Sequence, residues 1–317
     1  MQAKLAFTAG DLAQTRFAVS PMWEVVLSFR ALAAPTVPAL HRRWAEQVRP
    51  RWQAAGLDRG RLAALIPPKG YLADFLNPHP ATSFPELSAE LAAIRATPKE
   101  QYEVDLAHLP DGGPCWSPDE PNKVAAEIET YWELALAPYW ARIRTVLEAE
   151  VFHRARQVAE HGAAHLLNDL HESVSWDDDT LRLVRRMCAL HGAPTRGGLV
   201  LVPTVFGWPR VMTRTVAPDP PQLAYPARGI GTLWEPAATG PAEAVAAVMG
   251  RSRATLLAEL ETPASTTDLA GRTGLSAAGV SQHLTALRDA GLVSAHRVGR
   301  SVLYARTAVA DSLLSRR

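Results

Sequence analysis

The chain has 317 residues, 47% of them hydrophobic and 21% charged, which is enough apolar material for two ordinary domains. Its formal net charge is only +1, and no apolar run reaches the roughly 18 residues of a membrane-spanning helix. The two cysteines, Cys115 and Cys188, form no Cys-x-x-Cys motif, and the start of the chain does not look like a secretion signal. We therefore expect a soluble protein of the reducing cytoplasm.

The first half of the chain is predicted to be mainly helical. Apolar residues recur there with helical spacing, between turns that contain proline. This pattern predicts helices over Pro21–Ala33, Leu40–Ala55, Arg59–Ile66 and Glu86–Ala96. A longer helical segment is predicted over Asn122–Glu172, with breaks near Pro138 and Gly162.

Strand-like runs follow, separated by glycines and by a proline-rich turn, and they predict a small antiparallel β meander. The runs are Thr180–Val184, Leu199–Phe206, Arg210–Val216 and Gln222–Tyr225. The predicted fold class is α+β, mainly helical. An N-terminal domain spans residues 1–236, helical to about 172 with the meander at about 180–226, and a second domain spans 241–317 after a linker at Pro236–Pro241.

Two histidines form the strongest candidate for enzymatic chemistry. His161 and His165 are four residues apart, so they would share a helix face with Asp169 and Glu172 and could bind zinc. The alternative is an ordinary solvated helix face. The His-Glu-x-x-His motif of metalloproteases is missing because Gly162 stands at the glutamate position. We expect no enzyme activity and no cofactor.

The chain contains nine tryptophans, which is unusual for its length, and most of them lie before the second domain. Trp132 and Trp140, with Tyr131 and Tyr139, repeat at a separation of eight residues, which is about two helical turns. They either line one wall of a ligand pocket or belong to a helical core, and the sequence leaves both interpretations open.

The last quarter of the chain predicts two short helices joined by a turn. The serine and threonine residues at 265–267 are suitable caps for a first helix, which Gly274 ends. Ser276 is a suitable N-cap for a second helix that begins at Ala277, because its hydroxyl can accept a hydrogen bond from a free backbone N–H.

The second helix has two distinct faces. Val280, Leu284 and Leu287 form a narrow apolar stripe at i, i+4 and i+7. The opposite side is small and uncharged, with Ala277, Ala278, Ser281, Gln282 and Thr285. Short side chains allow a helix to approach base edges closely, and the amide of Gln282 can pair with adenine.

A hairpin is predicted after this helix. Gly291 suits the left-handed position that ends a helix, and two strands follow around a turn at Gly299. Arg297, Arg300 and Arg306 lie on or beside this hairpin, where their cations can reach phosphates.

The segment LSAAGVSQHLTALRDAGLVSAHRVGRSVLY, residues 275–304, resembles the recognition helix and wing of ArsR-type transcriptional regulators. The resemblance covers the chain from about Pro241 and implies a winged helix-turn-helix that binds DNA. It places Thr266, Thr267, Ser276, Ala277, Ala278, Ser281, Gln282, His283, Thr285, Arg297 and Arg300 near bases or phosphates. For His283 a packing role is the alternative, since it adjoins Leu284.

The chain departs from the metal-sensing members of that family. These carry a pair of cysteines on the first helix of the motif, where this chain has Thr266, Thr267, Asp268 and Leu269. On the last helix Asp311 is the only candidate ligand. We expect no metal site in this domain, and the residues that bind an effector are unknown. The preceding region resembles, through residues 17–21, 201–206 and 208–209, larger regulators with an uncharacterised N-terminal domain.

Positive charge is concentrated in the second domain. From Pro241 onward nine arginines face six acidic residues, a charge of +3, and residues 1–240 carry −2. This excess is modest, so we expect a homodimer that doubles the contacts with DNA, formed by the segment Ala242–Met249 and by the tail with Val309, Leu313 and Leu314.

The function predicted from the sequence is that of a cytoplasmic, dimeric, sequence-specific transcriptional repressor. Its partners would be a near-palindromic DNA operator, a second copy of the chain, and a possible small-molecule effector or partner at the N-terminal domain. One alternative is a structural or interaction protein with a winged-helix tether. The other is a DNA-tethered metalloenzyme that uses His161 and His165.

Overall fold

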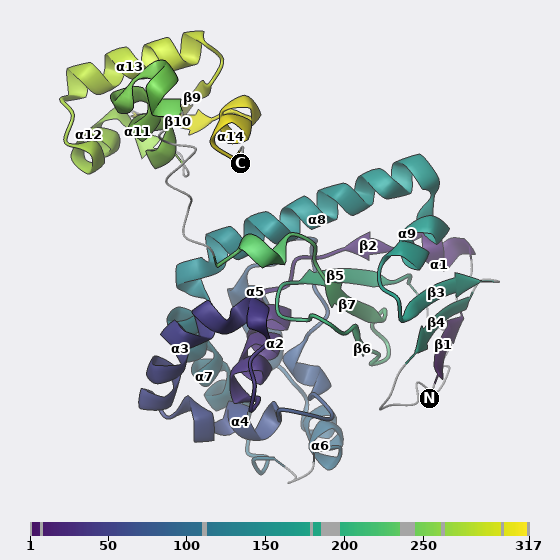
Figure 1. Cartoon of the computed structure of the whole chain (residues 1–317). Coiled ribbons are helices and arrows are strands. Elements are labelled where there is room, and N and C mark those ends of the chain that lie inside the picture. Colours follow the sequence, from purple (N-terminus) through teal and green to yellow (C-terminus); the bar gives the residue numbers. More distant parts are fainter. Residues whose placement is uncertain are drawn as a thin grey trace. The chain divides into compact units, whose positions relative to one another are not determined.

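The computed structural model describes residues 2–6, 9–109, 113–177, 180–184, 197–234, 245–260, 264–298 and 301–315. The chain divides into two compact units, an N-terminal unit Met1–Trp234 and a C-terminal unit Glu235–Arg317 (Figure 1). Helices predominate and the sheets are small, so the predicted α+β class is confirmed. The predicted linker at 236–241 lies outside the described residues.

Most of the N-terminal unit is helical. Its helices are α1 (Ala9–Ala13), α2 (Pro21–Ala33), α3 (Arg42–Ala54), α4 (Arg61–Leu65), α5 (Leu87–Arg95), α6 (Lys99–Ala107), α7 (Glu120–Ala135), α8 (Trp140–His161) and α9 (Ala163–Asp169). The four helices predicted before residue 100 correspond to α2, α3, α4 and α5. Helix α6 was not predicted, because four of its nine residues are charged and it buries only Tyr102, Asp105 and Leu106.

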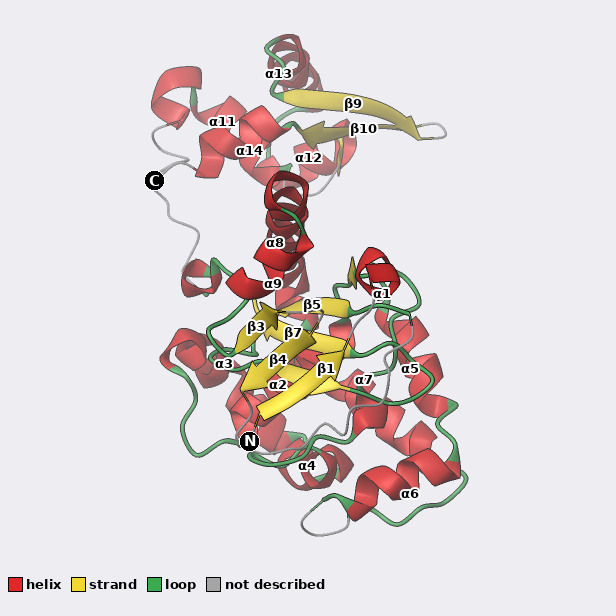
Figure 2. Ribbon diagram, turned by 90° about the vertical axis from the view of Figure 1, so that its right-hand side faces the viewer, coloured by secondary structure: helices red, strands yellow, loops and turns green. Residues whose placement is uncertain are grey.

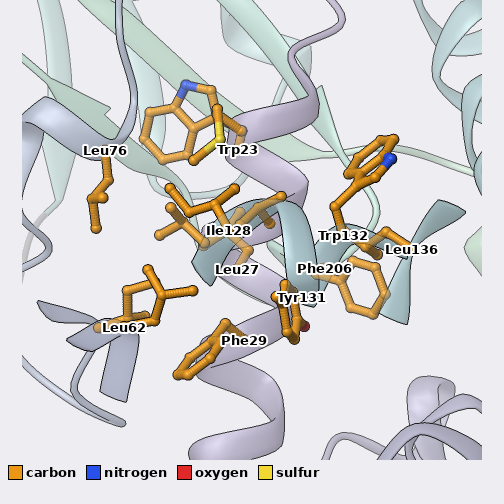
Figure 3. Packing of buried hydrophobic residues seen from close by; sticks show 14 of the residues in the cluster. Trp23, Leu27, Phe29, Leu62, Leu76, Ile128, Tyr131, Trp132, Leu136 and Phe206 are labelled. Carbon is orange, nitrogen blue, oxygen red and sulfur yellow. The ribbon is translucent and has the colours of Figure 1, made fainter. Parts of the chain in front are cut away.

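Helix α2 lies at the centre of this unit. The Ser20 hydroxyl accepts a hydrogen bond from the Trp23 N–H at 3.3 Å, and Pro21 fills the first turn, where no backbone N–H is needed. Every residue of α2 except Arg30 and Ala33 is buried. Figure 3 shows how closely its side chains pack with α7: the Phe29 and Tyr131 ring centroids are 5.1 Å apart.

The predicted segment Asn122–Glu172 consists of three helices, α7, α8 and α9. Both predicted breaks are confirmed. Pro138 lies in a single 3₁₀ turn between α7 and α8, and Gly162 separates α8 from α9 with a φ of 83°, which favours glycine. His161 and His165 therefore belong to two different helices.

The predicted antiparallel meander is wrong in its pairing. Strands β2 (Arg16–Phe17), β5 (Val200–Thr204), β7 (Gln222–Pro226) and β6 (Met212–Arg214) form one sheet in that order. In it β5 runs parallel to β2 and to β7, and only β6 is antiparallel. A separate antiparallel sheet has the order β1 (Gln2–Ala6), β4 (Thr180–Val184), β3 (Val174–Asp177) (Figure 2).

The physical reason for the parallel pairing is burial on both faces. All five residues of β5 are buried, as are the first four of β7, and strands of this kind are typical of parallel sheets covered on both sides. The chain passes through β6, at the far side of β7, before it returns as β7. Two consecutive reversals leave β5 and β7 pointing the same way.

Two buried glutamates connect α2 to neighbouring elements through hydrogen bonds. The Glu24 carboxylate accepts hydrogen bonds from two backbone N–H groups just after β5, at 2.7 and 3.3 Å. Glu90 of α5 accepts from the Ser20 hydroxyl at 2.6 Å and from the Met22 N–H at 2.9 Å. Burial raises the pKa of Glu24 to about 8 and that of Glu90 to about 7.

The C-terminal unit has its own hydrophobic core. Residues 245–249 are helical, and the remaining elements are α11 (Arg251–Glu259), β8 (Ala264–Ser265), α12 (Thr266–Thr273), α13 (Ala277–Asp289), β9 (Val293–Val298), β10 (Ser301–Arg306) and α14 (Ala308–Ser315). The strands form a three-stranded sheet in the order β8-β10-β9. Its core joins α11, α12, α13 and β9 through residues such as Leu257, Leu269, Leu284 and Val293.

Candidate nucleic-acid interface

The first helix of the motif, α12, begins with a reciprocal cap. The Ser265 hydroxyl accepts from the Asp268 N–H at 3.2 Å, and the Asp268 carboxylate accepts from the Ser265 N–H at 3.1 Å. The Ser265 hydroxyl also donates to the Asp268 carboxylate at 2.7 Å, and this bond, followed by that from the Ser265 N–H, lowers the pKa of Asp268. Thr266 is half-buried and Thr267 exposed in the first turn of α12, so these two predicted DNA contacts lie beside the cap.

A short turn orients the second helix. Gly274 ends α12 in the left-handed region with a φ of 71°, as predicted. Ser276 is the N-cap of α13, and its hydroxyl oxygen accepts from the Gly279 N–H at 3.2 Å. Because the Ser276 oxygen accepts this helix-capping bond, the hydroxyl proton is the part of the side chain that can donate to a phosphate.

Helix α13 separates its two faces as the sequence predicts. Val280, Leu284 and Leu287 are at most 2% exposed and pack into the core of the C-terminal unit. The predicted contact residues Ala277, Ala278, Ser281, Gln282 and Thr285 are all exposed. The structure therefore brings these five residues together on one open face.

The exposed face offers one long polar side chain. The Thr285 hydroxyl donates to the Ser281 carbonyl within the helix at 3.0 Å. The Gln282 amide makes no hydrogen bond with any residue that the structure describes, so both its donors and its acceptor are available. His283 is half-buried beside this face. Its partial exposure is compatible with both roles that the sequence left open, packing and contact with DNA.

A fixed junction links α13 to the hairpin. The Gly291 N–H donates to the Arg288 carbonyl and the Leu292 N–H to the Leu287 carbonyl, each at 2.9 Å, which is a Schellman motif. Gly291 has a φ of 72°, as the sequence predicts. The Thr307 hydroxyl, just after β10, donates to the Gly291 carbonyl at 2.8 Å and ties the returning strand to the same point.

The hairpin β9–β10 forms the wing (Figure 2). Arg297 lies in β9 opposite Val302, although its side chain is outside what the structure describes, and Arg300 lies outside the described residues altogether. The third arginine predicted to reach phosphates has another role. The Arg306 Nε lies 3.1 Å from the Asp311 carboxylate, and its side chain is only 16% exposed, so it anchors α14.

Other cations of the motif were not singled out from the sequence. Arg272 is exposed in the last turn of α12, and Arg288 is exposed near the end of α13, with its Nη2 3.4 Å from the Asp289 carboxylate. Arg251 and Arg253 are exposed at the start of α11. The positions of these four arginines within the predicted helices could have identified them from the sequence as further candidates for phosphate contacts.

Comparison with known proteins bears on this unit directly. Residues 255–295 match the family described as "Bacterial regulatory protein, arsR family". The C-terminal unit contains an ArsR-family domain. The resemblance predicted from residues 275–304 is therefore confirmed, and the ArsR-family domain indicates transcription regulation with DNA as a partner.

A solved structure gives a further match. It is described as that of the predicted DNA-binding transcriptional regulator from E. coli and is 31% identical in sequence, with a TM-score of 0.21. The match covers 23% of this chain and 82% of the other. A search of curated proteins finds no match to the chain.

The N-terminal unit matches a different family. Residues 121–231, from α7 to beyond β7, match the family DUF5937, described as a family of unknown function. This agrees with the expected combination of an ArsR-type reader and an uncharacterised N-terminal region. Among the described residues, every helix is too short or too polar to cross a lipid bilayer.

The predicted histidine pair lies on the surface of the N-terminal unit. The His161 and His165 ring centroids are 4.9 Å apart and both residues are exposed. Asp169 is engaged elsewhere, since its carboxylate accepts from Arg154 at 2.7 Å and from Gln157 at 3.0 Å. Within the described ranges, no three His, Cys, Asp or Glu side chains are grouped so as to hold a metal ion.

Proposed function

We propose that this protein is a dimeric transcriptional repressor of the cytoplasm, and not an enzyme. Its ArsR-family domain binds a near-palindromic operator with the exposed face of α13, and a ligand or partner of the N-terminal unit controls that binding. The observation that carries the proposal is the exposed, uncharged face of α13 at Ala278, Ser281 and Gln282. The apolar stripe on the other side of the same helix is fully buried. A solvated helix seldom leaves such a face without charge.

Exposed apolar side chains outside this face support a homodimer. Val248, next to α11, is 87% exposed, and Val309 and Leu313 of α14 are 59% and 38% exposed. Neighbouring Ala310 is buried in the core, so α14 keeps one face inward and the other in solvent. A two-fold interface would cover these residues and present two recognition helices to two half-sites.

Control would operate by population shift. A ligand or partner that favours one arrangement of the dimer changes the spacing of the two copies of α13, and its effect is limited by the difference in its affinity for the two arrangements.

The proposal is tested by selecting genomic DNA fragments on the purified full-length protein and measuring the affinity of the best site. Gln282→Ala should weaken that site about tenfold and relax its sequence, since a bidentate base contact contributes about 1–3 kcal/mol of discrimination. Gln53→Ala, at an exposed glutamine of α3, is the matched control and should change neither.

Salt dependence separates base contacts from phosphate contacts. Arg297→Gln or Arg300→Gln should reduce the slope of log affinity against log salt by about 0.9 for each DNA phosphate that the variant no longer neutralises. If no DNA is retained at low salt, the proposal is wrong. If DNA binds but Gln282→Ala leaves its sequence preference intact, Gln282 does not read the bases; if the wild type binds all fragments equally well, the domain serves as an unspecific tether.

A further inference from the structure

A second candidate site lies in the N-terminal unit, in a pocket of about 430 Å³ between α5, α7 and the start of α8. This volume falls within the range of small-molecule sites in proteins. Its wall combines two tryptophans, Trp132 and Trp140, with carboxylates from two helices, and Leu91 adds an apolar surface.

The two tryptophans are set at an angle to each other. The Trp132 and Trp140 ring centroids are 4.9 Å apart and the ring planes are inclined by 62°. Their neighbours in the predicted aromatic wall point elsewhere: Tyr131 is fully buried and its hydroxyl lies 2.7 Å from that of Ser28, and Tyr139 packs against Trp234. The two tyrosines of the predicted wall therefore belong to the packing of the unit, whereas the indole pair lines the pocket with Trp132 anchored in the same core.

The two indoles pack edge to face, so they offer a cation the ring faces turned to the pocket and not a space between the rings. The face of an indole ring carries negative charge density, so it attracts a cation placed over it more strongly than the face of a phenyl ring does. Trp132 is 9% exposed, which holds its ring in place before any ligand arrives.

The carboxylates of the pocket supply the complementary charge. Glu129 and Glu133 are one turn apart on α7, on either side of Trp132 in sequence, and Glu86 lies at the start of α5. The Glu129 carboxylate already accepts a guanidinium N–H from Arg95 at 2.6 Å. The side-chain carboxylates of Glu86 and Glu133 have no hydrogen bond or ion pair with any described residue, so two negative charges at the pocket are unpaired.

We propose that this pocket binds a lipophilic organic cation, and that such a cation is the effector of the regulator. The indole pair and Leu91 contact its apolar groups, and Glu86 and Glu133 neutralise its charge. An organic anion of the same size would be repelled by the two unpaired carboxylates. The part of this inference that concerns regulation rests on the function proposed above, whereas binding to the pocket does not.

Isothermal titration calorimetry on the full-length protein tests the pocket without DNA. Tetraphenylphosphonium is the probe, and tetraphenylborate is a control of the same shape and opposite charge. We expect the cation to bind at least tenfold more tightly than the anion. The double variant Glu86→Gln, Glu133→Gln should weaken cation binding about tenfold, and Trp140→Leu should do so by a similar factor.

Glu100→Gln is the matched control, because Glu100 is an exposed glutamate on α6 that does not line the pocket. It should leave cation binding unchanged. Equal binding of the two probes, no binding of the cation, or cation binding that survives the double variant would each overturn the inference. Circular dichroism spectra identical to that of the wild type exclude misfolding as the cause of any loss.

The same titration on the protein bound to its selected DNA site tests regulation. We expect tetraphenylphosphonium to change DNA affinity at least threefold in the wild type and not in the double variant. If the protein binds DNA but not the cation, this inference fails and the proposed function stands. If it binds the cation but no DNA, the proposed function fails and the pocket assignment stands.

Discussion

Two buried glutamates and one buried histidine should give the stability of the N-terminal unit an unusual dependence on pH. In the unfolded chain the pKa of a glutamate is near 4.5, but burial raises it to about 8 for Glu24 and about 7 for Glu90. Between these values the folded protein retains protons that the unfolded chain has lost, so the free energy of unfolding falls as pH rises. Burial lowers the pKa of His41 from its ordinary 6.5 to about 4. Between these two pH values the unfolded chain holds a proton that the folded protein has lost, so this histidine makes the free energy of unfolding rise with pH.

Because two glutamates outweigh one histidine, a net fall is expected from about pH 4.5 to 8, and it is steepest between about pH 6.5 and 7, where the histidine no longer opposes it. Urea unfolding followed by tryptophan fluorescence at several pH values in this window measures it, with a slope of at most about 1.4 kcal/mol per pH unit for each glutamate. Glu24→Gln should reduce the slope, because the variant has no proton to lose at this position. Glu100→Gln serves as the control, and a slope equal in wild type and Glu24→Gln would contradict the assignment.

At this scale the sequence predicts contacts that are local in the chain. The caps at Ser265 and Ser276 and the left-handed Gly291 join residues at most a few positions apart, and all three were predicted. The bonds of Glu24 to the end of β5 span more than 180 residues, and nothing near Glu24 in the sequence indicates them. The ion pair of Arg306 with Asp311 is local, only five residues apart, but it was not considered when Arg306 was assigned to phosphates.

At the scale of elements, the junction between α13 and the wing depends on one backbone conformation. Gly291 has a φ of 72°, and a Cβ added there would meet no atom within 4 Å. Gly291→Ala should therefore lower the stability of the C-terminal unit by the backbone strain alone, about 1 kcal/mol.

Gly271→Ala is the matched comparison for that variant. Gly271 lies inside α12 with ordinary helical backbone and equally open surroundings, so alanine should stabilise the unit by about 0.5–1 kcal/mol. Thermal unfolding followed by far-ultraviolet circular dichroism distinguishes the two. Equal shifts of the same sign would show that the left-handed conformation at 291 does not limit stability.

Elements themselves were predicted more readily than their pairing. The apolar periodicity of Pro21–Ala33 identifies α2 because a helix is a local structure. The pairing of β1 with β4 joins Gln2 to Val184, and no pattern inside either strand specifies its partner. The continuous apolar run at 199–206 was a signal of a strand buried on both faces, and it favoured the parallel arrangement that the meander prediction overlooked.

At the scale of the whole molecule, the two units have separate hydrophobic cores. The cluster that contains Leu269, Val280 and Leu284 includes no residue of the N-terminal unit. All nine tryptophans of the chain lie at or before Trp234 and none in the C-terminal unit. Tryptophan fluorescence therefore reports unfolding of the N-terminal unit alone, whereas circular dichroism reports both.

This separation predicts how core substitutions act. Leu284→Ala removes a fully buried side chain and should destabilise the C-terminal unit by about 2–5 kcal/mol, which shifts part of the circular dichroism transition and leaves the fluorescence transition in place. Ile128→Val, in the core of the N-terminal unit, should lower the fluorescence midpoint by an amount that corresponds to about 0.5–1.5 kcal/mol. If Leu284→Ala moved the fluorescence transition as far as the circular dichroism transition, the two units would unfold as one cooperative body, and a signal at the N-terminal unit would reach the DNA-binding unit through shared stability.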